Sequence, residues 1–120
     1  MERAHTRLDA VRERMDARIK ALPDEETKRE AYVHLYGVGL MASLLAIRRG
    51  HSRQTAELAE IAGMLHDLLT FIDPGADRRD HALPCARYAR DHILAGLEGF
   101  SAEEYFYGHP RVQRVLRELL

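Results

Sequence analysis

Hydrophobic side chains recur every three or four positions through most of the chain, which is the spacing of one face of an α-helix. The first such stretch covers about 4–22, where charged side chains occupy the remaining positions. We expect this amphipathic helix to pack on the core of the same domain, with a homodimer through the amino-terminal helix as the alternative. Its apolar stripe consists of Leu8, Val11, Met15, Ile19 and Leu22.

A second helix is predicted over about 25–49, because Pro23 interrupts the chain before it and Gly50 is suited to a left-handed cap after it. Its apolar residues cover a wide arc, so we expect this helix to be the central one, buried on most sides. Gly37 and Gly39 lower its helix propensity, and we expect them to let a neighbouring helix approach closely. The wide arc consists of Val33, Leu40, Met41, Leu44, Leu45 and Ile47.

Two further helices follow. One is predicted to begin near Ser52 and to end at the turn 73–75, and the next to begin near His81. Pro84 agrees with that start, since proline is tolerated only in the first turn of a helix. The residues expected to face inward are Leu58, Ile61, Ala62, Leu65 and Leu69 in the first, and Cys85, Ala86, Ala89, Ile93 and Leu97 in the second.

The remaining segment, 101–120, has a capping-box spacing and then a short amphipathic helix after Pro110. No segment shows the alternation of a half-buried strand. We therefore predict an all-α fold, a compact bundle of about five helices. It forms one domain over 1–120, with the amino-terminal helix at 1–22 and the core at 25–97.

The charge of the chain is nearly balanced, with 18 Lys plus Arg against 19 Asp plus Glu and a formal net charge of -1. No overall field draws it to nucleic acid, which we do not expect as a partner. The sole cysteine, Cys85, has no partner for an internal disulfide. The longest apolar stretch, 38–47, is shorter than the ~20 residues of a membrane-spanning helix. We expect a cytoplasmic protein without a membrane anchor.

Three side chains suggest a metal site. His34 falls within the apolar arc of the second helix and His66 continues the apolar row of the third, so we expect both to point inward. Asp67 follows about 100° further round the helix, so that its carboxylate and the His66 imidazole can converge. Gly63, one turn before Asp67, leaves space for an ion or a substrate close to the backbone.

Buried imidazole and carboxylate groups are costly unless they are paired, and one divalent cation would satisfy all three. The alternative is that His34 and His66 are core histidines bonded to backbone carbonyls, with Asp67 solvated near a helix end. The adjacent His-Asp pair, together with a histidine on the preceding helix, favours the metal site.

These residues lie in three stretches, namely 31–38 (AYVHLYGV), 62–67 (AGMLHD) and 80–82 (DHA) with Cys85, Ala86 and Ala89. Over about 29–97 the chain thereby resembles the HD superfamily of metal-dependent phosphohydrolases. The more specific feature is a His-Asp pair at the end of an apolar helix with a histidine 32 positions earlier. The resemblance implies that His34, His66 and Asp67 bind a divalent metal such as Mn, Fe, Co, Ni, Zn or Mg. It also implies that His81 serves a second metal or the phosphate.

The resemblance implies hydrolysis of a nucleotide or another small phosphoester by an activated water, which Asp67 would orient. The family pattern closes with an aspartate on a later helix. The aspartates that follow Asp67 here do not match that position; they are Asp73, Asp77, Asp80 and Asp91. The alternative function is therefore a non-catalytic module that uses the HD scaffold for self-association or ligand sensing, with part of the metal site lost.

Overall fold

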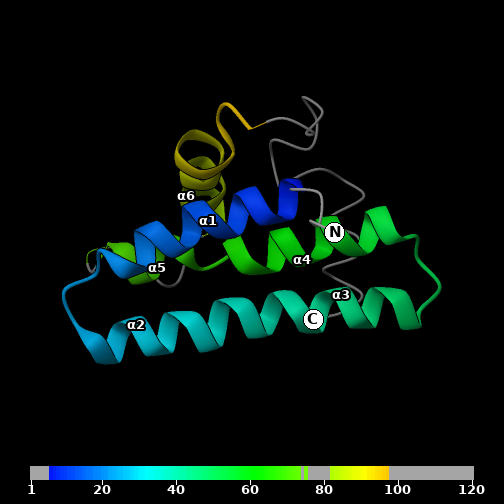
Figure 1. Ribbon diagram of the computed structural model, residues 1–120, viewed down its shortest axis with the longest axis horizontal. Coiled ribbons are helices and arrows are strands. Elements are labelled where there is room, and N and C mark those ends of the chain that lie inside the picture. Colours follow the sequence, from blue (N-terminus) through cyan, green and yellow to red (C-terminus); the bar gives the residue numbers. More distant parts are fainter. Residues whose placement is uncertain (1–5, 74, 76–81, 98–120) are drawn as a thin grey trace, which may run out of the picture.

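The computed structural model describes residues 6–73, 75 and 82–97, and all regular structure in this part of the chain is helical (Figure 1). The predicted all-α fold is confirmed, while the predicted terminal helix within 101–120 lies outside the described residues. The elements are α1 (Arg7–Lys20), α2 (Glu25–Ala31), the π-helical turn η1 (Tyr32–Tyr36), α3 (Gly37–Arg48), α4 (Arg53–Leu65), α5 (Leu68–Ile72), α6 (Ala82–Tyr88) and the π-helical turn η2 (Ala89–Leu94).

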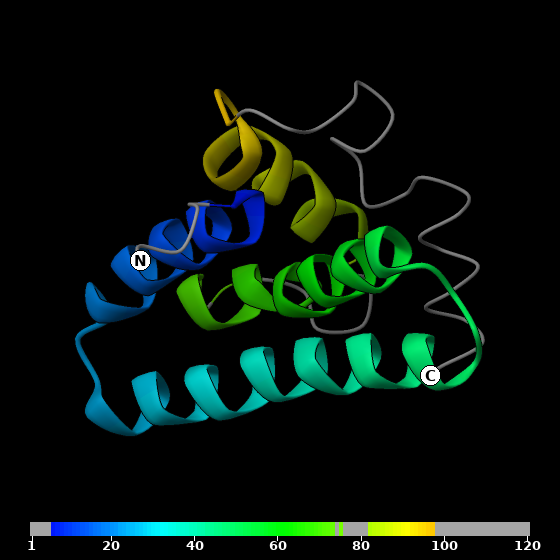
Figure 2. The same ribbon diagram turned by 45° about the vertical axis from the view of Figure 1, so that its right-hand side comes forward.

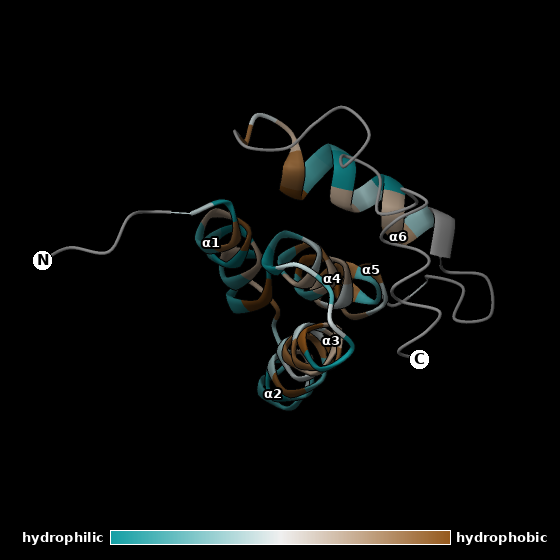
Figure 3. Cartoon of the chain, turned by 90° about the vertical axis from the view of Figure 1, so that its right-hand side faces the viewer, coloured by the Kyte–Doolittle hydropathy of each residue, from teal (hydrophilic) through white to brown (hydrophobic). Residues whose placement is uncertain are grey.

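The helices are arranged around α4. Elements α2, η1 and α3 form one continuous helix of 24 residues, Glu25–Arg48, which lies along one side of α4 and runs antiparallel to it (Figures 1 and 2). Seen end-on, α4 lies between α3, α1 and α6 (Figure 3). Most residues of α4 from Thr55 to Leu65 are buried. The central helix is therefore α4, and the prediction that the helix before it is central was wrong.

Polar caps fix the helix ends. The side chains of Thr6, Asp24 and Ser52 each accept a hydrogen bond from the backbone N–H three residues further on, which satisfies a donor that the first helical turn leaves unpaired. After α3, Gly50 adopts φ +84°, and its N–H donates to the carbonyl of Ile47. The predicted start near Ser52 and the predicted cap at Gly50 are confirmed.

The amino-terminal helix packs on the domain itself. Val11, Met15 and Ile19 are fully buried in the main core, which also contains side chains of α4 and η2. At the edge of this contact Arg12 forms an ion pair with Glu60 of α4 at 2.5 Å. The expectation that the α1 stripe is covered by the same domain is confirmed, so these side chains are not available to a second copy.

Helix α6 and η2 bury four of the five residues that their spacing predicted, and the fifth, Leu97, follows η2 and is partly buried. Cys85, Ala86, Ala89 and Ile93 are buried, and Pro84 lies in the first turn of α6. Burial raises the pKa of the Cys85 thiol above its ordinary value. The thiol is therefore protonated at neutral pH and behaves as core packing rather than as a nucleophile.

The helix Glu25–Arg48 contacts the domain mainly through small residues, since its buried positions are Ala31, Leu35, Gly39, Ala42 and Ala46. Most of its large apolar side chains point away from α4, with Leu35 buried and Leu45 partly buried as exceptions, and the prediction that this helix is buried on most sides was wrong. The most exposed are Val33 at 70%, Leu40 at 54%, Met41 at 59%, Leu44 at 53% and Ile47 at 53%.

A close crossing of α3 and α4 explains this choice of face. A Cβ atom on Gly39 would lie 2.8 Å from the carbonyl oxygen of Glu60, and one on Gly63 would lie 2.9 Å from the Cα of Gly39. Large side chains do not fit between backbones this close. The expected role of Gly39 is confirmed. A Cβ atom on Gly37 would meet nothing within 4 Å, so the same expectation for Gly37 was wrong. The space predicted beside Gly63 is filled by α3.

By length and composition alone, the helix Glu25–Arg48 could cross a membrane. Core helices of soluble proteins often meet the same criterion, and one face of this helix is packed on α4. The finding is weak support for a membrane role, and the absence of a membrane anchor stays a prediction.

Candidate metal centre

His66 and Asp67 lie where the third predicted helix is broken. α4 ends at Leu65 and α5 begins at Leu68, and between them Asp67 has φ -118° and ψ 7°, outside helical geometry. The carbonyl of Asp67 accepts hydrogen bonds from the backbone N–H of Thr70 at 3.0 Å and from its hydroxyl at 2.6 Å. These bonds make Asp67 the N-cap residue of α5, so the prediction of one unbroken helix up to the turn at 73 was wrong.

His34 comes from the π-helical turn η1 in the middle of the long helix. Such turns are rare within α-helices and are frequent at functional sites. The Tyr36 hydroxyl donates a hydrogen bond to Asp16 of α1 at 2.5 Å, and the Tyr32 and Tyr36 rings stack 5.9 Å apart. Burial, reinforced by the bond to Asp16, raises the pKa of Tyr36 above its ordinary value. Tyr36 thus anchors the turn that carries His34 to α1.

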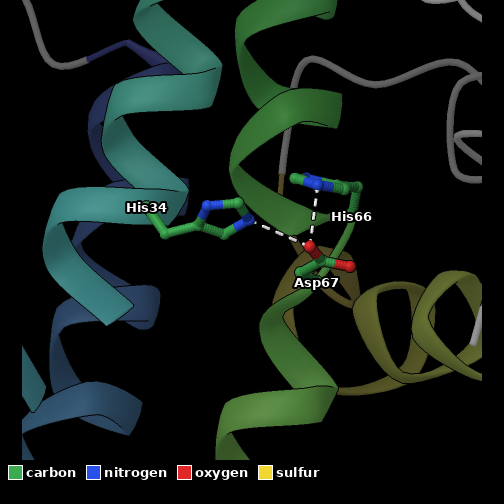
Figure 4. Close-up of side chains that lie close together, drawn as sticks. All are labelled: His34, His66 and Asp67. Carbon is green, nitrogen blue, oxygen red and sulfur yellow. Dashed lines mark hydrogen bonds and ion pairs between the residues drawn. The ribbon is translucent and has the colours of Figure 1, made fainter. Parts of the chain in front are cut away.

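The three predicted side chains converge across the two helices (Figure 4). The Oδ2 atom of Asp67 lies 3.0 Å from Nε2 of His34 and 3.0 Å from Nε2 of His66. One potential ligand atom from each residue lies within 4.8 Å of the other two. The predicted convergence of the side chains is confirmed; that they hold a metal ion stays a prediction.

The cluster is more exposed than the sequence predicted. The side chain of His34 is 45% exposed, and those of His66 and Asp67 are 22% and 21% exposed. The reason is that α2, η1 and α3 lie at the edge of the bundle, so His34 reaches Asp67 from the rim. The Phe71 ring of α5 lies 6.0 Å from the His34 ring and covers part of it. A small ion or molecule can therefore approach from solvent.

One hydrogen bond makes Nδ1 of His66 a donor. Its Nδ1 atom lies 2.5 Å from the carbonyl oxygen of Gly63, and because a carbonyl only accepts, Nδ1 must donate. In the neutral imidazole the lone pair is then on Nε2, which faces the Asp67 carboxylate. Two lone-pair atoms 3.0 Å apart repel unless a proton or a cation lies between them. Histidine ligands of metals usually make such a second bond to a carbonyl or carboxylate.

Only two of the other candidate residues, Asp73 and Asp91, are among those that the structure describes. His81, predicted to serve a second metal or the phosphate, lies outside the described residues, as do Asp77 and Asp80. Asp91 is exposed and pairs with Arg90 at 2.7 Å. Within the described part of the chain, the candidate metal group consists of His34, His66 and Asp67, without a fourth ligand.

Sequence reasoning missed the residues that position the cluster. Phe71 follows Asp67 by four positions, a spacing that could have placed its ring near the site. The bonds from Thr70 to the Asp67 carbonyl and from Tyr36 to Asp16 depend on the break in the helix and on the packing of α1, and no local pattern indicated them.

Comparison of the chain with protein-family models, with curated proteins and with solved structures gave no match. The assignment of this site therefore depends on the positions and chemistry of its own side chains.

Proposed function

We propose that the chain is a metal-dependent phosphohydrolase of the HD type, in which His34, His66 and Asp67 hold a divalent ion. The observation that supports this most is the single Asp67 oxygen flanked at 3.0 Å by two imidazole nitrogens. For His66, the bond from Nδ1 to the Gly63 carbonyl leaves Nε2 as the ligand atom. A cation at this point would remove the repulsion between Nε2 and the carboxylate.

The donor atoms suit a divalent ion. Two imidazoles and one carboxylate are ligands for Mn, Fe, Co, Ni or Zn, and the carboxylate also suits Mg. The three donor atoms lie within 4.8 Å of one another, so small side-chain movements would bring them to the ~2.0–2.3 Å of a metal bond. When bound, such an ion neutralises phosphoryl charge and makes a water nucleophile available near neutral pH.

The residues of the site have distinct tasks in this proposal. His66 is held in one orientation by the Gly63 carbonyl, which keeps Nε2 aimed at the site. Asp67 binds the ion and orients the attacking water. His34 is half exposed, so the substrate, a nucleotide or another small phosphoester, can enter beside it. By resemblance we assign the phosphate or a second metal to His81.

A second candidate is a non-catalytic HD-type module for self-association or ligand sensing. It is favoured by the three-residue ligand set, since a carboxylate as fourth ligand is not found among the described residues. In that case the ion would be retained without turnover.

A hydrolysis assay distinguishes the two candidates. The full chain is incubated with 4-nitrophenyl phosphate, its bis ester and a panel of nucleotides, with and without added Mn, Ni, Co, Zn or Mg. We expect turnover that requires added metal, since three side chains hold an ion loosely, and its loss in Asp67→Ala. Asp91→Ala is the matched control, because this exposed carboxylate pairs with Arg90 outside the cluster. Metal binding without hydrolysis of any substrate would instead support the module.

A further inference from the structure

The exposed side of the helix Glu25–Arg48 carries a continuous apolar stripe. Val33, Leu40 and Ile47 recur every seven residues and Leu44 follows Leu40 by four, the 4-3 spacing of helices that pack on another helix. Each of these side chains is more than half exposed, as is the neighbouring Met41. The small residues of the opposite face already pack on α4. The helix is therefore apolar on two sides, and only one of them is covered by the described domain.

The exposed apolar area of the stripe can be compared with the area that each partner buries in a dimer. The 24-residue helix is about 36 Å long at 1.5 Å per residue. Its five exposed large side chains present on the order of 400 Å² of apolar surface, which is the size of the largest patch on many monomers and often marks a functional surface. A standard interface buries about 800 Å² per partner, so the stripe would supply about half of that area and the flanking residues the rest.

Charges at the two ends of the stripe are complementary to each other. Glu26 lies seven residues before Val33, so an acidic side chain extends the stripe at its amino end, with Glu30 beside it. Glu26, Glu30 and Arg48 are exposed, as is Arg29 beside the two acidic side chains. Residues 25–30 carry a formal charge of -1, from three Glu against Lys28 and Arg29, whereas Arg48 and Arg49 at the carboxyl end carry +2. A parallel copy would place like charges together, whereas an antiparallel copy places the acidic end of one helix beside the basic end of the other.

The shape of the face agrees with this pairing. An open groove of about 350 Å³ lies beside the stripe and meets it at Val33. Gly37 and Met41 line the groove together with His34, Val38, Ala42 and Leu45, so a partner seated there would lie next to the candidate metal cluster. Gly37 has no contact that explains it within the described domain, and its missing side chain deepens the groove. A Leu40 or Leu44 side chain from a facing helix is of the size to enter it.

We propose that the chain forms a two-fold homodimer in which the Val33–Leu40–Leu44–Ile47 stripes of two copies pack antiparallel. With the axis near Leu40, Val33 of one copy lies opposite Ile47 of the other, and Glu30 comes within reach of Arg48. A two-fold axis makes each contact occur twice, which suits a self-complementary face. This interface differs from the α1 stripe, which is buried, and it does not depend on the proposed hydrolase activity.

The test measures the mass of the full chain in solution by sedimentation and light scattering over a range of concentrations. We expect twice the chain mass of 13.7 kDa for the unchanged protein. Leu40→Glu places a charge at the axis in both copies and should weaken the dimer by at least about 100-fold. Because Leu40 is more than half exposed, the variant should keep its helical circular dichroism. Ala17→Glu, at an exposed position of α1, is the control and should leave the dimer intact.

A charge exchange tests the antiparallel arrangement independently of the apolar contacts. Glu30→Arg should weaken the dimer, and adding Arg48→Glu to it should restore the association. The proposal is overturned if the unchanged chain is a monomer at every concentration, which would mean that another segment of the chain covers the stripe. It is also overturned if Leu40→Glu leaves the dimer intact, or if a monomer binds phosphatidylglycerol vesicles through Leu40, which would assign the stripe to a membrane surface.

Discussion

Replacing Gly39 with alanine tests the helix crossing that brings His34 to Asp67. The new Cβ would lie 2.5 Å from Cγ of Met64 and 2.8 Å from the carbonyl oxygen of Glu60. The Met64 side chain can move, but the Glu60 carbonyl belongs to the backbone of α4. The two helices must therefore move apart, and His34 moves with α3.

The size of the effect follows from two opposing terms. Overpacking a close contact costs about 1–3 kcal/mol. Alanine in place of glycine within a helix returns up to about 1 kcal/mol. We expect Gly39→Ala to lower the free energy of unfolding by about 1–2 kcal/mol.

Gly37→Ala is the matched control, because nothing lies within 4 Å of its Cβ position. This variant should raise the free energy of unfolding by about 0.5–1 kcal/mol through helix propensity alone. Urea unfolding followed by far-ultraviolet circular dichroism, at one low protein concentration, compares the two. If Gly39→Ala stabilises the protein as much as Gly37→Ala does, the close crossing of α3 and α4 is wrong.

Three other substitutions test the packing of the domain. Met15→Ala removes a fully buried side chain and should lower the free energy of unfolding by about 2–5 kcal/mol. Leu44→Ala, at an exposed position, should change this free energy far less in the monomer. Equal losses of the two variants in urea unfolding would contradict the assigned core. Folding raises the pKa of Tyr36 above its ordinary value of 10.0. The contribution of this hydroxyl to the free energy of unfolding is therefore complete below pH 10. It declines as the pH rises further, because the unfolded chain releases the proton first. Tyr36→Phe should therefore flatten the alkaline decline of unfolding free energy, and superimposable pH profiles would refute the burial of this hydroxyl.

The features that could be predicted from the sequence are those decided by local chemistry. Ser52 has a side chain that can accept from the backbone ahead of it, and Gly50 can adopt the positive φ that ends α3. The α1 stripe has a single apolar face, so only one orientation buries it. His66 and Asp67 are adjacent in the sequence, so the sequence alone also predicted that these two site residues lie together.

The features that could not be predicted depend on which surfaces meet. After its charged first turns, the helix Glu25–Arg48 is apolar nearly all round, so its periodicity does not reveal that the small residues face α4. Gly37 and Gly39 look alike in sequence, yet only Gly39 lies at the crossing. The break before α5 and the half-exposed position of His34 both follow from packing between helices. The exposure of the cluster was therefore mispredicted, although its members were identified.

The most direct test of the metal centre is the number of ions that the purified chain binds. After treatment with a chelator, titration calorimetry with Mn²⁺ or Zn²⁺ should give one site formed by His34, His66 and Asp67, and His66→Ala should weaken binding by at least about 10-fold. His92→Ala is the control, because this histidine also adjoins an aspartate but packs against Tyr88 with a ring distance of 4.6 Å. We predict that His92→Ala binds the ion as the unchanged chain does. Absence of binding, or equal binding by His66→Ala and the unchanged chain, would contradict the metal centre.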